Sequence, residues 1–235
     1  MNLELAPKVF ISCPINKVKS YCLDDYFNYV LKLQYPNKQY YYVDNSKDES
    51  FTEKTRLKHG LDIDWVDPQQ HSNTEYMCAS MNRCRKVFLD SDCDYWLVLE
   101  CDIFPPLDVI QHLLGLNKDV VALPYMTGEG EQQFIINTEI EPHFGEVIRH
   151  VAGWEGYIKH NGKLSKNDFV GWGCTLLRRN IVEDNVFYIS NRQKVHADTF
   201  FYLNLNDDGV DVFRDNNIIC THKNMSWKYV TDYHR

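Results

Sequence analysis

The sequence predicts an α/β protein with a mixed, mostly parallel central sheet flanked by helices. Short apolar segments rich in β-branched and aromatic residues recur along the first 125 residues, and segments with helical spacing of apolar residues lie between them. Such alternation is typical of βαβ units. With 235 residues, 44% of them hydrophobic and 14% aromatic, the chain can bury a core within one domain.

Four of the five expected strands of this first part are apolar runs, and the other, LDIDWV, alternates apolar and polar residues. They lie at residues 8–13, 40–43, 61–66, 95–99 and 120–125. The run YWLVL at 95–99 has the strongest strand character because every residue in it is apolar. It is therefore expected at the centre of the sheet.

Helices are expected between these strands. The first is expected to be capped by Ser20, to carry Asp24 and Asp25 in its first turn, and to end near Pro36. A second is expected to end at Gly60. The helices after the first are expected at 51–59, 74–89, 107–114 and 198–206.

The pattern loosens after residue 125. Residues 126–168 are expected to be a long irregular stretch, and strand character returns at 169–177 around a Gly-Trp-Gly turn. Short strands are expected at 210–213 and 218–220. The whole chain is interpreted as one domain, residues 1–235, with a first half 1–125, a second half 126–223 and a tail 224–235.

Charge and cysteine content limit the function. The formal net charge is -8 and the basic residues are scattered, so nucleic acid is not an expected partner. An acidic protein that handles a phosphorylated substrate usually needs a metal ion. The eight cysteines contain no C-x-x-C pair, and neither a signal peptide nor a run of ~18 apolar residues is seen, so we expect a soluble, reduced, cytoplasmic protein.

An acidic triplet, Glu100-Cys101-Asp102, follows the strand at 95–99. Residues two apart in extended backbone point to the same side, so Glu100 and Asp102 are expected to face one ligand while Cys101 packs behind them. Open α/β sheets bind ligands at the carboxyl ends of their strands. Hard divalent cations take oxygen ligands, so a Mg²⁺ or Mn²⁺ site is favoured over the alternative, an acid pair that caps a turn.

The stretch YWLVLECDIFPP resembles the strand and D-x-D motif of the GT-A glycosyltransferases of the family-2 type. The resemblance implies a single GT-A domain whose first half binds a nucleotide sugar and whose second half holds the acceptor and the catalytic residue. It implies that Asp102 coordinates Mn²⁺ or Mg²⁺, with Glu100 nearby, and that Glu100, Cys101 and Asp102 contact the donor. This chain departs from the family pattern by having glutamate first.

The beginning of the chain, KVFISCPIN followed by a helix and YYYVDNS, resembles the nucleotide-binding start of these enzymes. The resemblance places Pro14 and Ile15 near the base and Asp44 at the uracil or ribose, which indicates a UDP-sugar. The alternative for Asp44 is a turn residue that caps its own loop. Arg83 is placed near a phosphate, with a solvated helix face as the alternative.

Three motifs of the second half extend the resemblance. Gly171, Trp172 and Gly173 resemble a turn on the acceptor side, where the Trp ring would stack on a sugar; the alternative is a tight turn with a core Trp. Asp198 resembles the catalytic base of inverting members, and the alternative is an acid favoured by a helix dipole. His222 resembles the C-terminal metal ligand, and Lys223 is placed on the diphosphate, although a lone histidine is more often structural.

The resemblance as a whole implies a metal-dependent glycosyltransferase that moves a sugar from a nucleoside-diphosphate sugar to a hydroxyl of a glycan or another acceptor, with inversion. Three alternatives stay open: a non-catalytic module that binds sugar nucleotides or glycans, a nucleotidyltransferase, and a glycosyltransferase that acts on nucleic acid. The second usually needs a glycine-rich, basic loop after the first strand, and FISCPINKVK has no glycine.

Overall fold

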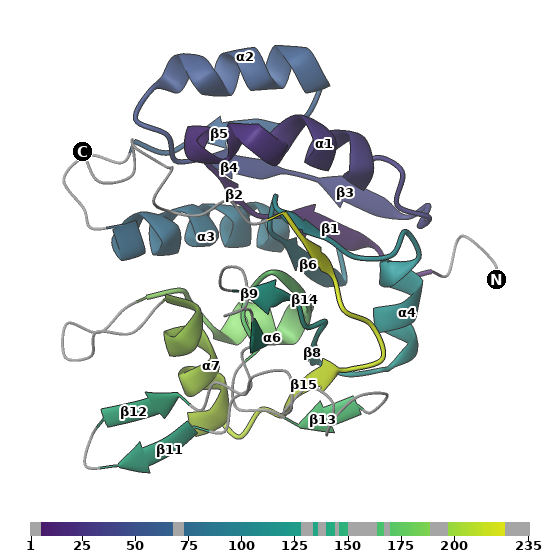
Figure 1. The fold of residues 1–235 in the computed structure, drawn as a ribbon, viewed down its shortest axis with the longest axis vertical. Helices are drawn as coiled ribbons and strands as arrows, with labels where there is room; N and C mark the ends of the chain where they lie inside the picture. Colours follow the sequence, from purple (N-terminus) through teal and green to yellow (C-terminus); the bar gives the residue numbers. More distant parts are fainter. Residues whose placement is uncertain are drawn as a thin grey trace.

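The computed structural model describes residues 6–67, 73–127, 134–135, 140–143, 146–149, 164–166, 170–188 and 197–223. A seven-stranded sheet lies at its centre (Figure 1). The strands, in their order across the sheet, are β13 (Leu164–Lys166), β15 (Val212–Asp215), β8 (Val120–Ala122), β14 (Cys174–Arg178), β6 (Tyr95–Leu99), β1 (Val9–Ser12) and β3 (Lys38–Tyr40).

Most of these strands run in one direction. Strand β1 is parallel to both β3 and β6, and β8 is parallel to β15. Strand β14 is antiparallel to its neighbours β6 and β8, and β13 is antiparallel to β15. The predicted mixed, mostly parallel sheet is therefore confirmed, with β6 near its middle.

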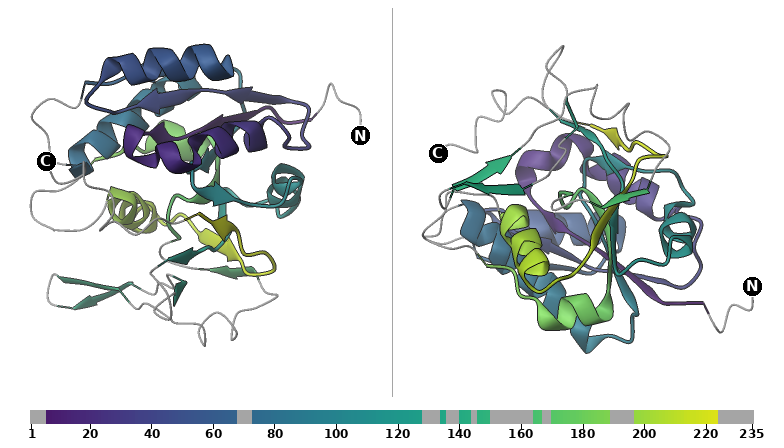
Figure 2. Two further views of the ribbon diagram at one scale, coloured as in Figure 1. Left: turned by 45° about the horizontal axis from the view of Figure 1, so that its top comes forward. Right: turned by 90° about the horizontal axis from the view of Figure 1, so that it is seen from below.

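Helices cover both faces of this sheet, and in the view from below α4 and α7 lie on opposite sides of it (Figure 2). One face carries α1 (Ser20–Val30) and α4 (Val109–Gly115), and the other carries α3 (Asn73–Asp90), α6 (Arg179–Asp184) and α7 (Ala197–Asp207). Helix α6 was not expected from the sequence.

Strand β6 is apolar throughout and β1 is apolar except for Ser12, because both of their faces are buried. Ile11 and Leu97 pack with α1 and α4, whereas their neighbours Phe10 and Trp96 pack with α3 and the C-terminal helices. All four side chains are fully buried. This alternation follows from the two-residue period of a strand and explains why YWLVL was easy to recognise.

A smaller parallel sheet is formed by β2 (Pro14–Ile15), β4 (Tyr42–Asp44) and β5 (Ile63–Trp65). The expected strand at 40–43 is thus divided, since the chain leaves the main sheet after Tyr40 and enters the small one at Tyr42. Helix α2 (Glu49–His59) begins after its cap Asp48 and ends at Gly60, whose φ of 64° suits glycine.

The start of α1 differs from the prediction. A short 3₁₀ helix, η2 (Lys17–Lys19), precedes it, and Asn16 caps η2 by accepting a hydrogen bond from the backbone N–H of Val18 at 3.0 Å. Ser20 is therefore the first helical residue of α1 rather than its cap, and its hydroxyl contacts the carbonyl oxygen of Lys17. The helix ends at Val30, well before Pro36.

The stretch 126–168, expected to be irregular, contains strands among its described residues. These are β9 (Met126–Thr127), β10 (Phe134–Ile135), β11 (Ile140–His143), β12 (Glu146–Arg149) and β13 of the main sheet. They are too short, or too polar, to stand out as apolar runs in the sequence. The predicted tail from residue 224 lies outside the described residues.

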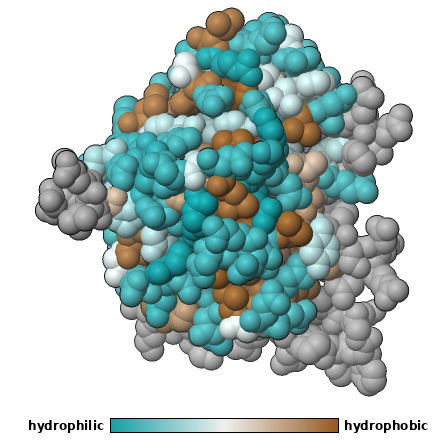
Figure 3. Space-filling model, turned by 180° about the vertical axis from the view of Figure 1, so that it is seen from behind, coloured by the Kyte–Doolittle hydropathy of each residue, from teal (hydrophilic) through white to brown (hydrophobic). Residues whose placement is uncertain are grey.

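Two further strands, β7 (Ile103–Phe104) and β16 (Thr221–His222), form an antiparallel pair beside the main sheet. The strand expected at 218–220 lies instead at Thr221–His222. The surface seen from behind is mostly hydrophilic, with apolar residues scattered over it (Figure 3). In the part of the chain that the structure describes, no helix is both long and apolar enough to span a bilayer.

Candidate active site

The candidate site lies where β6 ends. Glu100 follows the last strand residue, and its backbone N–H donates to the carbonyl oxygen of Gly173 at 2.9 Å. The chain then turns, because the N–H of Ile103 donates back to the carbonyl oxygen of Glu100 at 3.0 Å, and continues into β7. This turn carries Asp102, whose side chain is almost completely buried.

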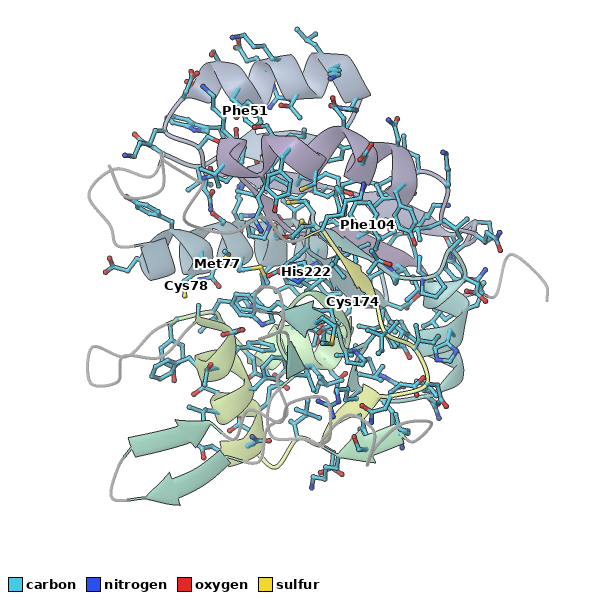
Figure 4. All side chains as sticks on the ribbon, in the orientation of Figure 1. Phe51, Met77, Cys78, Phe104, Cys174 and His222 are labelled. Carbon is cyan, nitrogen blue, oxygen red and sulfur yellow. The ribbon has the colours of Figure 1, made fainter. Side chains whose placement is uncertain are left out.

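The pairing of β7 with β16 brings His222 to this turn. His222 is opposite Ile103 in the register, and the N–H of Lys223 donates to the carbonyl oxygen of Asp102 at 2.8 Å. His222 Nε2 therefore lies 3.3 Å from Asp102 Oδ2. The imidazole is near the centre of the molecule, at the end of the C-terminal strand (Figure 4).

The orientation of the His222 ring is fixed by its other nitrogen. Nδ1 donates to the carbonyl oxygen of Met126 at 2.6 Å, which directs Nε2 toward Asp102. Burial would lower the pKa of His222, but the Asp102 carboxylate outweighs burial and raises it. In turn, burial would raise the pKa of Asp102, but His222 and Lys19 hold it low, at about 2. Each group of this pair therefore favours the charged form of the other.

Lys19 and Tyr21 were not identified from the sequence, yet both reach the same carboxylate. Lys19 Nζ contacts Asp102 Oδ2, and the hydroxyl of Tyr21 donates to that oxygen at 3.5 Å. They come from η2 and the first turn of α1, next to the expected cap Ser20. No local sequence signal relates these residues to a strand end about 80 residues later.

The pKa of Glu100 shifts in the opposite direction from that of Asp102, although the two side chains share the same charged neighbours. Burial, the charge of Asp102 and the charge of Asp198 raise the pKa of Glu100 to about 7, against the opposing effects of Lys19 and His222. A half-buried carboxyl next to a second carboxylate resists ionisation. A cation placed between the two acids would remove that cost.

Asp102 and His222 fit a divalent ion. Their oxygen and nitrogen atoms converge from two strands, and the Nδ1 hydrogen bond of His222 leaves Nε2 available as a ligand. A carboxylate suits Mg²⁺ and Mn²⁺. Among the residues that can be described, no three His, Cys, Asp or Glu side chains form a cluster suited to a metal.

The Gly-Trp-Gly turn lies against a tyrosine that was not identified from the sequence. A Cβ atom on Gly173 would lie 2.2 Å from Cε1 of Tyr125, and one on Gly171, where φ is 72°, would lie 2.8 Å from the Tyr125 hydroxyl. The ring of Tyr125 also packs edge-on against His222, with centroids 5.3 Å apart. Both glycines are needed for this close packing beside His222.

Trp172 lies in the core rather than beside an open site. It is 4% exposed and packs edge-on against Phe187 and Phe201, at centroid distances of 5.2 and 6.3 Å. This arrangement corresponds to the alternative given above, a tight turn with a core Trp. Within the described structure, its ring has no face free to stack on a sugar.

Asp198 lies in the first turn of α7 and is half-buried. Its Oδ1 accepts a hydrogen bond from the backbone N–H of Thr199 at 2.7 Å. One turn later, the hydroxyl of Tyr202 donates to the carbonyl oxygen of Gly171 at 3.0 Å and so attaches the helix to the glycine turn. The charge of Asp198 is one of the causes that raise the pKa of Glu100, so the two acids interact electrostatically.

The residues expected at the nucleotide base lie in the small sheet. Ile15 is 1% exposed, and β2 pairs Pro14 with Val43. Asp44 is fully buried, and accepts hydrogen bonds from the backbone N–H of Ser46 at 2.8 Å and from the hydroxyl of Thr52 at 2.6 Å. Asp44 thus caps the turn that follows β4, as the alternative interpretation of this residue expects.

The two remaining cations each have an acidic partner, and Cys101 is buried. Arg83 Nε donates to Asp64 Oδ2 at 2.8 Å, and Lys223 Nζ donates to Asp25 Oδ2 at 2.6 Å. Cys101 is 4% exposed and packs in the core as expected. The structure thus brings together Glu100, Asp102, Asp198, His222 and the glycine turn, while Arg83 and Lys223 are held by surface acids.

Comparison with solved structures identifies the architecture. The mannosyltransferase PcManGT from Pyrobaculum calidifontis, solved with GDP-Man and Mn²⁺, matches 99% of this chain with a TM-score of 0.62 and 11% identity. GalNAc-T7, solved with UDP, GalNAc and Mn²⁺, matches 93% with a TM-score of 0.62 and 10% identity. The chain has a GT-A fold.

At the level of sequence, no family model and no curated protein matches this chain. TarS of S. aureus in complex with UDP-GlcNAc matches 93% of the chain with a TM-score of 0.54 and 14% identity. The chain spans 60% of PcManGT, 44% of GalNAc-T7 and 60% of the TarS fragment. At these identities the likeness establishes the fold alone.

Proposed function

We propose that this chain is a metal-dependent glycosyltransferase that uses a nucleoside-diphosphate sugar, with UDP as the nucleotide. The observation that carries the proposal is the convergence of Asp102 and His222 at the carboxyl end of β6 in a GT-A fold. Ligands of open α/β sheets bind at this edge. Three solved structures with the same fold contain nucleotides or nucleotide sugars, and two of them contain Mn²⁺.

In this proposal Asp102 and His222 hold Mn²⁺ or Mg²⁺, and Glu100 supplies a further carboxylate. When bound, the ion stabilises the negative charge that develops on the departing diphosphate. Pro14, Ile15 and Asp44 line the nucleotide side, and Arg83 and Lys223 contact phosphate oxygens after leaving Asp64 and Asp25. Cys101 packs behind the two acids and holds their backbone in place.

Asp198 is proposed as the general base. It takes the proton of the acceptor hydroxyl while that oxygen bonds to the anomeric carbon and the bond to the diphosphate breaks. One displacement of this kind inverts the anomeric centre. Gly171, Trp172 and Gly173 belong to the acceptor side, where the two glycines hold the ring of Tyr125 and Trp172 supports the turn from the core. The half-buried position of Asp198 near Glu100 supports this role.

The test is a donor screen. The protein is incubated with UDP-, GDP- and other nucleotide sugars, with Mn²⁺ or with EDTA, and the release of nucleoside diphosphate and the thermal unfolding temperature are measured. Metal-dependent release or stabilisation by one donor is expected. Binding without turnover, unchanged by Asp198→Asn, would favour a non-catalytic binding module, and no binding to any donor would refute the proposal.

A further inference from the structure

Three side chains converge on one oxygen atom of Asp102. Lys19 Nζ is in direct contact with Oδ2, His222 Nε2 lies 3.3 Å from it, and the Tyr21 hydroxyl lies 3.5 Å from it. The side chain of Asp102 is 2% exposed and that of Lys19 is 21% exposed. Lys19 is therefore the more exposed partner of a nearly buried carboxylate.

The segment that carries Lys19 is held in place at several points. The Asn16 amide donates to Asn45 Oδ1 at 2.7 Å, and the backbone N–H of Lys17 donates to the Ser46 hydroxyl at 2.7 Å. These bonds tie η2 to the loop after β4. The backbone that carries Lys19 is thus held in place, so its contact with Asp102 differs from an ion pair between two mobile surface side chains.

A metal ion and Lys19 need the same atom. An ion held between Asp102 Oδ2 and His222 Nε2 must bind the carboxylate oxygen that now contacts the ammonium group of Lys19. Two cations so close together repel strongly in a site with little water. Binding of the ion therefore requires that Lys19 leaves Asp102, which costs a charge-assisted hydrogen bond.

We propose that Lys19 is an internal counter-ion that competes with the divalent metal for Asp102, and that the donor diphosphate accepts the displaced ammonium. This inference rests on the proposed function, because it assumes that the metal and the diphosphate bind here. Metal binding and nucleotide binding are then coupled. The metal binds weakly alone and much more tightly with the nucleotide, because the nucleotide offers Lys19 a new anionic partner. Lys19 is then a positioning residue for both ligands.

The test measures Mn²⁺ binding by the electron paramagnetic resonance signal of the free ion, with and without UDP, and needs no turnover. Lys19→Met removes the ammonium and keeps a chain of similar length. We expect it to bind Mn²⁺ about tenfold or more tightly than the wild type in the absence of UDP, since one hydrogen bond to a charged group no longer has to break. The gain in Mn²⁺ affinity on adding UDP should shrink.

The matched control is Lys17→Met, which removes an ammonium two residues earlier whose partner is Asp48, at 3.6 Å on the surface. It should bind Mn²⁺ like the wild type. Should Lys19→Met not fold in the presence of EDTA, Lys19→Gln, which also lacks the charge, is measured instead. Circular dichroism checks the fold of each variant.

Each outcome decides the matter. Tighter Mn²⁺ binding by the Lys19 variants, but not by Lys17→Met, supports the competition. If the wild type binds Mn²⁺ and UDP and the Lys19 variants bind Mn²⁺ no more tightly, the competition is refuted while the proposed function stands. If no form binds Mn²⁺ even with UDP, the proposed metal site fails and the competition fails with it.

Discussion

His222 and Asp102 are separated by 120 residues in the chain, yet their side chains lie 3.3 Å apart. The contact is enforced by two strands of two residues each, β7 and β16, in which His222 is opposite Ile103. Backbone pairing therefore fixes the distance between the two proposed ligands. A change in either side chain should alter the proposed metal site without removing the strands that build it.

Asp102→Asn is expected to abolish stabilisation by metal. In saturating UDP, Mn²⁺ at about 100 times its dissociation constant should add roughly 2.7 kcal/mol to the unfolding free energy of the wild type, and EDTA should remove this gain. The variant lacks the charged oxygen that the ion needs. Its own stability should fall by about 1–3 kcal/mol, because Lys19 and His222 lose a buried partner.

The control for this experiment is Asp92→Asn, which removes an exposed carboxylate paired with Lys8. It should keep the full gain from Mn²⁺ and UDP in a thermal unfolding assay. A gain of equal size in Asp102→Asn would show that the ion binds elsewhere.

The sheet could be predicted because its signal is local. Residues 96–99 are buried on both faces, so the run at 95–99 is apolar and marks a central strand, and acids at its end mark the ligand edge. His222 was identified only through its order in a resemblance. A strand of two residues has no period to detect, so its partner β7 could not be identified from the sequence.

Lys19 and Tyr125 could not be predicted for a related reason. Lys19 lies in a 3₁₀ turn whose length and direction depend on contacts with the loop at Asn45. Tyr125 looked like the end of an apolar strand, whereas its ring fills the space above two glycines. Both roles come from packing between distant segments, which the order of residues does not encode locally.

Asp198→Asn is expected to lower the turnover of the preferred donor and acceptor by at least about 100-fold, the usual contribution of a general base. The amide cannot accept the acceptor proton but keeps the shape of the side chain. Donor affinity, measured by calorimetry with Mn²⁺, should stay unchanged. Asp207→Asn, at the exposed end of the same helix, is the control and should keep full activity. Full turnover in Asp198→Asn would exclude it as the base.

Gly173→Ala is expected to disturb the site through Tyr125. The new methyl would lie 2.2 Å from Cε1 of that ring, so the ring must move away from His222. Such overpacking costs about 1–3 kcal/mol, and the Mn²⁺-dependent shift in unfolding temperature should shrink as well. Urea unfolding measures the first effect and thermal unfolding the second.

Gly115→Ala is the control, since a Cβ atom at Gly115 has no neighbour within 4 Å. It should cost no stability. If the clash with Tyr125 is the cause, Tyr125→Ala combined with Gly173→Ala should be less destabilising than the sum of the two single variants. Additive effects would place the cost of Gly173→Ala somewhere other than at Tyr125.

Asp64→Asn is expected to lower stability in a pH-dependent manner. Asp64 accepts hydrogen bonds from the Tyr41 hydroxyl at 2.6 Å and from Arg83 Nε at 2.8 Å. Burial alone would raise the pKa of Asp64, but these two partners lower it below its ordinary value of 3.8. Because the carboxylate is about one third exposed, its loss should cost about 1 kcal/mol at pH 7.

The sign of the pH dependence follows from this lowered pKa. The unfolded chain binds the Asp64 proton more tightly than the folded one, so the contribution is complete above the ordinary pKa and disappears as the pH falls through the folded value. Urea unfolding from pH 7 to about pH 3 should therefore show the wild type and Asp64→Asn converging. Asp62→Asn, which changes an exposed acid two residues earlier, should match the wild type throughout. A difference for Asp64→Asn that does not change with pH would mean that the ionised carboxylate is not what stabilises this contact.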